Sequence, residues 1–470
     1  MNTTKTIQNV WSCHLVLIGI CFILSTGCAK ENISFAAVEL VYSQLAEDPT
    51  TEAVISWITN ETAGHSNIFR YSKINDPVFI KIKAKTKSIP ERNDLQLHTV
   101  KIHNLSPGCV YQFKVGKQNI IRSFKTLPAN LPSNGIKVGF AGDAHFDGKG
   151  HNLYDEFCRV MRDEEIHILA GTGDYVDCEG IIGLVQTNRW LGFLSMIDRY
   201  LCQKNNKYNY IPLVLAIGNH ETDPDNGTDP DAANYLRFFF EYPNKLEPEG
   251  QNYGTIKVGD YLQLLIMDTW HTAIPGGHQK KWLKNVIDQT ITHAVPIMHA
   301  TPFPTNRNPW GKVEKAIRDE WLEIFYNSEN IRIAFDGHDH SWKRTVPLGI
   351  NSERPVHGSN EKDKGYFTVN DNYIVRKENG IVFFGDGGWG SNSRGERYNP
   401  ATTWYLEDAQ DRMNIYKKGF SAADHQNDGK TAGKHWEHIF IAVFKSEDIV
   451  VQSLDPSGNV FHSYKLCYSN

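Results

Sequence analysis

Five short segments of the chain carry side chains that commonly bind metal ions. Each segment contains an Asp, Asn or His, and each follows a run of apolar residues. Carboxylates suit hard cations, imidazoles suit borderline ones, and one carboxylate can bridge two cations. The segments therefore predict a site for two metal ions. In chain order they contain Asp143 and His145; Asp174 and Asp177; Asn219, His220 and Glu221; His299; and His338, Asp339 and His340.

Taken singly, each segment is weak evidence for a metal site. A lone His at the end of a strand is more often a hydrogen-bonded structural residue, and an Asp after Gly is more often part of a turn or a helix cap. If each segment had only a structural role, the occurrence of all five in this order would be a coincidence. We therefore favour metal binding for the set.

Alternating strands and helices from residue 136 onward must position these segments. Their pattern predicts a layered α/β domain. The metal-binding segments fall just past the carboxyl ends of the strands, where open α/β sheets place their ligands. The predicted strands are 137–141, 166–170, 211–217, 262–267, 295–298 and 331–335, and the predicted helices are 153–162, 181–201, 279–291 and 313–326.

A smaller all-β domain is expected before the α/β domain. Pro107 and Gly108 predict a turn across which the hydroxyl of Tyr111 can bond back, as at a tyrosine corner, and the stretch resembles a fibronectin type III domain. A Pro-containing linker follows at 127–132. We assign the sandwich to 33–128 and the catalytic domain to 135–470. The predicted strands are short and β-branched or aromatic, at 54–57, 67–71, 98–102, 111–115 and 122–125.

Length and charge narrow the function classes. A chain of 470 residues, 40% of them hydrophobic, can bury a large core and is expected to form two domains. The 49 basic and 54 acidic residues nearly balance, without a Lys/Arg-rich block that would follow a nucleic-acid backbone, so nucleic-acid binding is not expected. The five cysteines after Cys28 lack metal-ligand spacing; one or two disulfides are compatible with them.

The first 28 residues predict a secretory signal. Lys5 is followed by an apolar stretch at 16–24 and by small residues up to Gly27. The ending at Cys28 resembles the lipobox of bacterial lipoproteins, which implies acylation of Cys28 and a membrane tether. Plain signal-peptidase cleavage is the alternative. We expect an exported protein, either a periplasmic or cell-surface lipoprotein or a secreted one.

The order DxH, GDxxD, GNHE, a single His and GHxH resembles the calcineurin-like metallophosphoesterase superfamily over residues 136 to about 345. The N-terminal sandwich and the string at 337–344 resemble the purple acid phosphatase branch. The resemblance implies two domains, an all-β sandwich and an α/β domain in which a β-sandwich is flanked by helices. It also implies one metal held by Asp143, His145, Asp174 and His340, and a second held by Asp174, Asn219, His299 and His338, so that Asp174 bridges them.

Two positions depart from the purple acid phosphatase pattern. That branch carries DxG and GDxxY, in which the Tyr binds ferric iron. This chain has His145 in place of the Gly and Asp177 in place of the Tyr, so one ligand is gained as another is lost. Two Fe, Zn or Mn ions remain compatible with the set. We expect Tyr175, one residue past Asp174, to be structural.

The implied activity is hydrolysis of phosphomonoesters by a metal-bridged hydroxide, with His220 as the catalytic group beside the leaving oxygen. Phosphodiesters or nucleotides are alternative substrates, and a surface protein that binds a glycan or a partner is the alternative of another class. Behind the ligands we expect Asp177, Glu221 and Asp339, of which the last two can orient neighbouring imidazoles. We predict substrate contacts for three residues on loops, with ordinary surface loops as the alternative: Arg307, Trp310 and His271.

Overall fold

The computed structural model describes residues 40–60, 67–148, 152–178, 181, 183–205, 207–222, 233–240, 252–305, 307–353, 367–385, 387–390 and 437–467. The predicted signal segment and Cys28 lie outside these residues. In the described part of the chain, no helix combines the length and the apolar character needed to span a membrane. The five described cysteines, Cys109, Cys158, Cys178, Cys202 and Cys467, are all free thiols.

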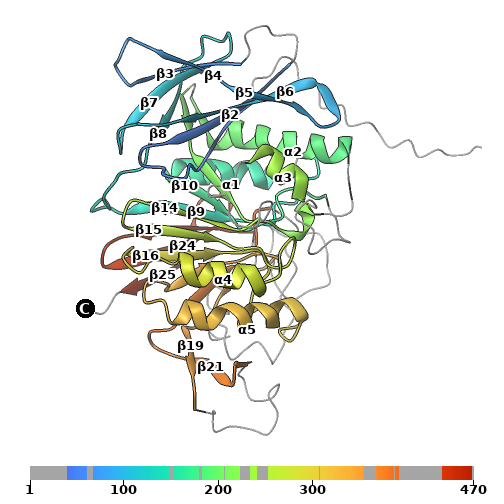
Figure 1. Cartoon of the computed structure of the whole chain (residues 1–470), viewed down its shortest axis with the longest axis vertical. Coiled ribbons are helices and arrows are strands. Elements are labelled where there is room, and N and C mark those ends of the chain that lie inside the picture. Colours follow the sequence, from blue (N-terminus) through green and yellow to red (C-terminus); the bar gives the residue numbers. More distant parts are fainter. Residues whose placement is uncertain are drawn as a thin grey trace, which may run out of the picture. The chain divides into compact units, whose positions relative to one another are not determined.

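The N-terminal part consists of strands (Figure 1). In β7 every second side chain is buried, which places Tyr111 and Phe113 inside. The hydroxyl of Tyr111 accepts the backbone N–H of Ser106 at 2.8 Å, so the predicted bond across the turn is confirmed. The strands are β1 (Leu40–Gln44), β2 (Ala53–Asn60), β3 (Ile68–Lys73), β4 (Ile80–Lys83), β5 (Lys85–Ile89), β6 (Arg92–Ile102), β7 (Val110–Val115) and β8 (Arg122–Lys125).

The following part alternates strands and helices as expected. Its first half contains β9 (Ile136–Ala141), α1 (Asn152–Asp163), β10 (Ile168–Gly171), α2 (Leu184–Met196), the π-helix η1 (Ile197–Leu201), β11 (Gln203–Lys204), β12 (Lys207–Tyr210), β13 (Pro212–Leu215), the 3-10 helix η2 (Asn219–Glu221) and α3 (Asn234–Phe239). Its second half contains β14 (Gly254–Val258), β15 (Leu262–Ile266), α4 (Gly277–Val286), β16 (His293–Ile297), α5 (Lys312–Tyr326), β17 (Ile333–Phe335), β18 (Lys343–Arg344), β19 (Leu348–Asn351), β20 (Thr368–Val369), β21 (Asn372–Arg376), β22 (Val382–Gly385), β23 (Ile439–Phe444), β24 (Asp448–Leu454) and β25 (Val460–Cys467).

The sheets run across the boundary between the two parts. Strand β1 pairs in parallel with β13, which creates a ten-stranded sheet in the order β25-β24-β23-β9-β10-β13-β1-β2-β6-β5. Strand β12 pairs in parallel with β8, in a six-stranded sheet ordered β11-β12-β8-β7-β3-β4. The N-terminal β domain is therefore joined to the catalytic domain by backbone hydrogen bonds as well as by the linker.

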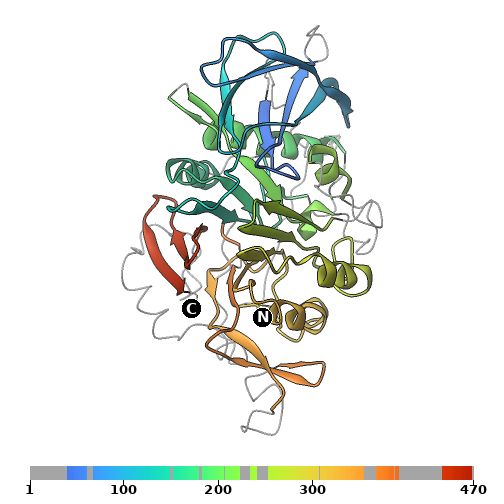
Figure 2. The same cartoon turned by 60° about the vertical axis from the view of Figure 1, so that its left-hand side comes forward.

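The catalytic domain has four layers. Alternating side chains of β9 and β10, such as Val138 and Ile168, pack against Leu264 of β15 and Phe335 of β17, so the ten-stranded sheet faces a second sheet ordered β14-β15-β16-β17-β22-β18. Helices α1 to α3 lie on one side of this pair of sheets, and α4 and α5 lie on the other (Figures 1 and 2). This is the predicted α/β class, a β-sandwich flanked by helices.

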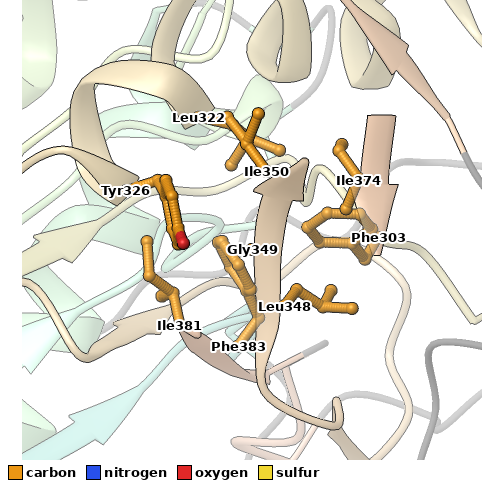
Figure 3. Close-up of a pocket in the computed structure, with 9 residues that line it drawn as sticks. All are labelled: Phe303, Leu322, Tyr326, Leu348, Gly349, Ile350, Ile374, Ile381 and Phe383. Atoms are coloured by element: carbon orange, nitrogen blue, oxygen red, sulfur yellow. The ribbon is translucent and has the colours of Figure 1, made fainter. Parts of the chain in front are cut away.

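The outer apolar layer under α5 closes around a small pocket, shown in Figure 3. Its walls come from α5, β19, β21 and β22, and the hydroxyl of Tyr326 is the polar side-chain group among them. The pocket therefore belongs to the core and offers no acid, base or metal ligand. It is lined by Phe303, Leu322, Tyr326, Leu348, Gly349, Ile350, Ile374, Ile381 and Phe383.

Two predicted helices differ at their ends. The helix predicted to reach residue 291 ends at Val286, because Ile287 is extended and Asp288 accepts the backbone N–H of Thr290, which forms a turn. The helix predicted over 181–201 begins at Leu184 and continues from residue 197 as a π-helix. No strand was predicted after residue 335, where the structure has β18 to β25.

Candidate metal centre

Five of the seven predicted ligands adopt the left-handed backbone conformation just past their strands. Parallel strands β9 and β10 of one sheet and β16 and β17 of the other end at the same edge, just before these residues. A positive φ is uncommon for residues other than glycine and clusters at functional sites, where the surrounding structure holds it. The left-handed residues are Asp143 (φ 57°), His145 (47°), Asp174 (55°), His338 (84°) and His340 (53°).

The first group of donors consists of Asp143, His145, Asp174 and His340. One ligand atom from each lies within 4.8 Å of those of the others. Nε2 of His145 lies 3.0 Å from Nε2 of His340 and 3.4 Å from Oδ2 of Asp174. Nε2 of His340 lies 3.2 Å from Oδ1 of Asp143. The four residues predicted for the first metal therefore converge.

The second group of donors shares Asp174 with the first. Nε2 of His299 lies 3.2 Å from Oδ2 of Asp174, 3.1 Å from Oδ1 of Asn219 and 3.0 Å from Nδ1 of His338. Nδ1 of His299 donates to the carbonyl of Thr172 at 2.9 Å, which leaves Nε2 as the acceptor when the ring is neutral. Asp174 thus lies where a bridging carboxylate is needed.

The chemistry of the donors fits two cations. Burial would lower the pKa of His145, but the carboxylates of Asp143 and Asp177 raise it to about 10. Burial would likewise lower the pKa of His299, but Asp174 raises it to about 9. Without metal, the carboxylates hold protons on these imidazoles, and a metal binds by releasing such protons. Imidazole nitrogens together with carboxylates suit Zn, Fe or Mn.

Asp177 lies beside the first group and orients His220. Oδ1 of Asp177 is 3.1 Å from Nδ1 of His220 and 3.9 Å from Nδ1 of His145. The imidazoles of His145 and His220 hold the pKa of Asp177 well below its usual range. The opposite nitrogen of His220, Nε2, lies 3.9 Å from Oδ2 of Asp174. His220 therefore presents Nε2 toward the shared carboxylate.

We expected Glu221 to orient a neighbouring imidazole, but its hydrogen bonds are with the backbone. Its buried carboxylate accepts the N–H groups of Asp174 at 2.8 Å, Tyr175 at 2.7 Å and Gly218 at 2.9 Å. Burial, and then the charge of Asp174, raise the pKa of Glu221 to about 7. One side chain thus fixes the loop of the bridging carboxylate against the loop of Asn219.

Tyr175 is structural, as predicted. Its fully buried hydroxyl donates to the carbonyl of Ala216 at 2.8 Å and accepts the N–H of Gly173 at 3.0 Å. Because the phenol is hydrogen-bonded to the backbone, it does not replace the tyrosine ligand of purple acid phosphatases.

Asp339 makes contacts with a neighbouring loop, and its predicted orientation of an imidazole stays a prediction. Oδ2 accepts the N–H of Thr305 at 2.8 Å, and Oδ1 lies 3.1 Å from Nε of Arg307. A terminal nitrogen of the Arg307 guanidinium lies 3.5 Å from Nδ1 of His338 and 3.4 Å from its carbonyl. Asp339 therefore holds Arg307 beside a candidate ligand of the second metal.

The other two predicted substrate residues occupy different surroundings. The ring of His271 lies 5.4 Å from that of His299, and its backbone N–H donates to buried Asp268 at 2.7 Å. Burial lowers the pKa of His271 to about 3, so this ring is neutral. The ring of Trp310 packs on Phe367 at 4.7 Å, at the apolar cluster under α5. Substrate contact by Trp310 stays a prediction.

Two supporting features were missed in the sequence. Gly387 has a φ of 68°, and a Cβ there would overlap the carboxylate of Asp143. A signal was available, since Gly387 and Gly388 lie three and four residues after the apolar run 381–384. The second feature is the buried ammonium of Lys343, which lies 2.7 and 2.8 Å from the carboxylate oxygens of Asp336. Thr301 donates to Asp336 at 2.9 Å, so the pair links the His299 loop to the loop of His338 and His340.

Comparison with known proteins agrees with this geometry. Residues 38–126 match the family model "Purple acid Phosphatase, N-terminal domain", and residues 136–342 match "Calcineurin-like phosphoesterase". A purple acid phosphatase, PPD1 from yellow lupin, shares the fold, with a TM-score of 0.65 and 17% identity over 91% of this chain and 74% of the lupin chain.

Curated relatives match this chain at low sequence identity. "Probable inactive purple acid phosphatase 27" of Arabidopsis thaliana is 22% identical over 57% of this chain and 47% of its own length. "Uncharacterized protein Rv2577" of Mycobacterium tuberculosis is 22% identical over 67% of this chain and 64% of its own length. "Purple acid phosphatase 22" of Arabidopsis thaliana is 21% identical over 55% of this chain and 56% of its own length. The chain spans about half to two thirds of the length of these relatives. It belongs to the calcineurin-like metallophosphoesterases, in a purple acid phosphatase-like branch, and carries DxH and GDxxD in place of DxG and GDxxY.

Proposed function

We propose that this protein is an exported phosphatase that uses two metal ions to hydrolyse phosphomonoesters. The observation that carries the proposal is the place of Asp174 in two donor groups at once, one with His145 and His340 and the other with His299 and His338. A structural cluster has no need for two imidazole-rich groups around one carboxylate, whereas a two-metal site requires that arrangement.

The proposed ligands are those that converge. Asp143, His145, Asp174 and His340 would hold one metal, and Asp174, Asn219, His299 and His338 the other. When bound, two cations supply Lewis acidity to the phosphoryl oxygens and lower the pKa of water at the site. Fe, Zn and Mn all suit this donor set.

Side chains around the cluster supply the remaining groups. His220, oriented by Asp177 at 3.1 Å, is the proposed proton donor to the leaving oxygen. Arg307, fixed by Asp339 at 3.1 Å, is the proposed partner of a non-bridging phosphate oxygen. A phosphomonoester dianion carries more charge toward Arg307 than a diester does, which favours monoesters.

The names of several relatives include the word "inactive", so activity has to be tested directly. The protein should hydrolyse p-nitrophenyl phosphate faster than its bis ester, and a chelator should stop both reactions. A faster reaction on the bis ester would favour a phosphodiesterase. Turnover that a chelator leaves unchanged would contradict the two-metal mechanism. No turnover after loading with Zn, Mn or Fe would favour a surface binding protein instead.

Export is proposed from the first 28 residues, with Cys28 as the lipidated anchor. Replacing Cys28 by Ser should release the protein from a membrane fraction without changing its specific activity, because an acyl chain anchors and does not catalyse. Unchanged fractionation would contradict the lipid anchor and leave plain secretion.

A further inference from the structure

The charged side chains on the strands of the six-stranded sheet in the N-terminal domain are all basic. Its strands, β3, β4, β7, β8, β11 and β12, contain no Asp or Glu, although acidic residues outnumber basic ones in the whole chain. Since alternate side chains point to opposite faces, the residues out of phase with buried Tyr111 and Phe113 point outward. Lys204 of β11 also points outward but is paired with Asp163 at 2.6 Å. We call the six other outward cations the basic face: Arg70, Lys81, Lys83, Lys114, Lys125 and Lys207.

Three cations of the basic face stand in one row. Arg70 of β3 lies directly opposite Lys81 of β4 and directly opposite Lys114 of β7. Like charges directly opposite each other destabilise a sheet. The guanidinium of Arg70 donates to the carbonyl of Gly116, and the ammonium of Lys114 lies 5.2 Å from the ring centroid of Phe79. Neither contact supplies a negative charge.

Lysines elsewhere on the protein are commonly paired with carboxylates. Lys101 lies 3.2 Å from Glu52, and Lys257 lies 2.7 Å from Asp288. Within the described residues, no carboxylate comes within ion-pair distance of any member of the basic face. The turn after β3 does contain Asp76, whose carboxylate accepts the N–H of Val78. The repulsion on this face is therefore left for a partner to neutralise.

Protection of a sheet edge explains only part of this pattern. Lysines on an edge strand discourage pairing with another chain, and β4, with Lys81 and Lys83, is an edge strand. Arg70, Lys114, Lys125 and Lys207 lie on β3, β7, β8 and β12, which have neighbours on both sides. Protection of a sheet edge does not explain these four charges.

Exposed aliphatic side chains border the basic face at two turns. Between β3 and β4, Ile74 and Val78 are 50% and 69% exposed, and between β7 and β8, Ile120 and Ile121 are 39% and 53% exposed. Basic residues next to exposed aliphatic ones are typical of surfaces that rest on anionic membranes, where cations meet phosphates and apolar groups enter the interface.

We propose that the basic face docks on an anionic phospholipid bilayer, with the aliphatic turns at the headgroup boundary. A soluble polyanion would use the charges but would leave the aliphatic side chains in water, so the bilayer is the better match. The site requires neither catalysis nor a lipid on Cys28.

Vesicle binding tests the proposal in the full chain carrying Cys28→Ser, so that no acyl chain contributes. Phosphatidylcholine vesicles are compared with vesicles that also contain phosphatidylglycerol, at about 0.1 M and about 1 M salt, where the screening length falls from about 10 Å to about 3 Å. Adding Lys81→Gln and Lys114→Gln should weaken binding to the anionic vesicles about 30-fold. Each basic residue near an anionic surface contributes about 1 kcal/mol, and about 1.4 kcal/mol corresponds to a tenfold change in affinity.

The matched control changes the same charge elsewhere, by Lys257→Gln and Lys465→Gln, and should bind like the unsubstituted protein. The Lys81/Lys114 variant should keep its circular dichroism and its unfolding midpoint, because removing like charges from one row costs no contact with a carboxylate. Equal loss in the control, equal binding to neutral vesicles, or binding of a soluble polyphosphate without binding of vesicles would each overturn the proposal.

Discussion

Nε2 of His145 lies 3.0 Å from Nε2 of His340. Purple acid phosphatases have glycine at the position of His145. His145 keeps a φ of 47°, a conformation that glycine adopts without strain. The chain therefore places an imidazole in a backbone geometry suited to glycine, and this imidazole faces the same carboxylates as His340. His145 in place of Gly therefore adds a nitrogen donor, while Asp177 in place of Tyr removes the phenol that purple acid phosphatases use as a ligand.

The colour of the iron-loaded protein follows from these contacts. We predict no strong purple band, because the phenol of Tyr175 is bonded to Ala216 and Gly173 and Asp177 cannot give a tyrosinate transition. Visible absorption after loading with ferric iron measures this. The double variant His145→Gly with Asp177→Tyr should gain the band, and the single variant His145→Gly is its control. A purple unsubstituted protein would contradict the ligand set.

Loss of one donor from the second group should remove one metal. Asn219→Ala and His299→Ala should each bind about one equivalent less metal and lose at least about 100-fold in turnover of p-nitrophenyl phosphate. Metal analysis and steady-state kinetics measure both effects. Asn209→Ala, on exposed β12, is the matched control and should change neither. Full activity in either ligand variant would remove these residues from the site.

The ion pair between Lys343 and Asp336 should contribute strongly to stability when only one partner is removed. Lys343→Met leaves the Asp336 carboxylate buried without its ammonium and should lower the free energy of unfolding by about 3–5 kcal/mol. The double variant Lys343→Met with Asp336→Leu should recover much of that loss, because no buried charge remains. Denaturant unfolding compares them. Equal losses in the single and double variants would show that the lone charge is not the cause.

A buried histidine of the N-terminal domain should make stability depend on pH. His98 lies between the hydroxyls of Thr59 and Thr86 at 2.8 and 2.9 Å, and burial lowers its pKa from 6.5 to about 4. Between these values the unfolded chain binds a proton that the folded chain does not, so the contribution of neutral His98 is complete above pH 6.5 and is lost toward pH 4.

The comparison with His98→Gln isolates this contribution from other titrating groups. The gap in unfolding midpoint between the unsubstituted protein and the variant should narrow as pH falls from 6.5 to 4. Thermal unfolding at several pH values measures the gap. A gap that stays constant or widens on acidification would contradict the assignment of a neutral buried ring.

The sequence predicts the convergence of the candidate ligands well because each follows a strand whose apolar run is local. His299 and His340 can be placed at strand ends without knowing how the strands pair, and parallel strands then bring their ends together. The pairing of β1 with β13 cannot be read in this way. It joins segments far apart in the chain, and no local pattern near Ser43 specifies Pro212 as its neighbour.

The supporting residues show where residue type ceases to be informative. Glu221 and Asp339 are carboxylates beside imidazoles in the sequence, yet one accepts backbone N–H groups and the other holds Arg307. Lys343 looks like a surface lysine after the metal-binding segment, yet it is fully buried because Asp336 and Thr301 surround its ammonium. Direction of a side chain, rather than its chemistry, was the missing information.

The central claim, that the shared carboxylate of Asp174 organises two catalytic cations, is tested most directly by titrating metal into the stripped protein. Turnover of p-nitrophenyl phosphate and bound metal are measured on the same samples, for the unsubstituted chain and for Asp174→Asn. We predict that turnover appears as binding approaches two equivalents, and that Asp174→Asn binds less metal and stays inactive. Full turnover with the metal removed, or in Asp174→Asn, would contradict the account.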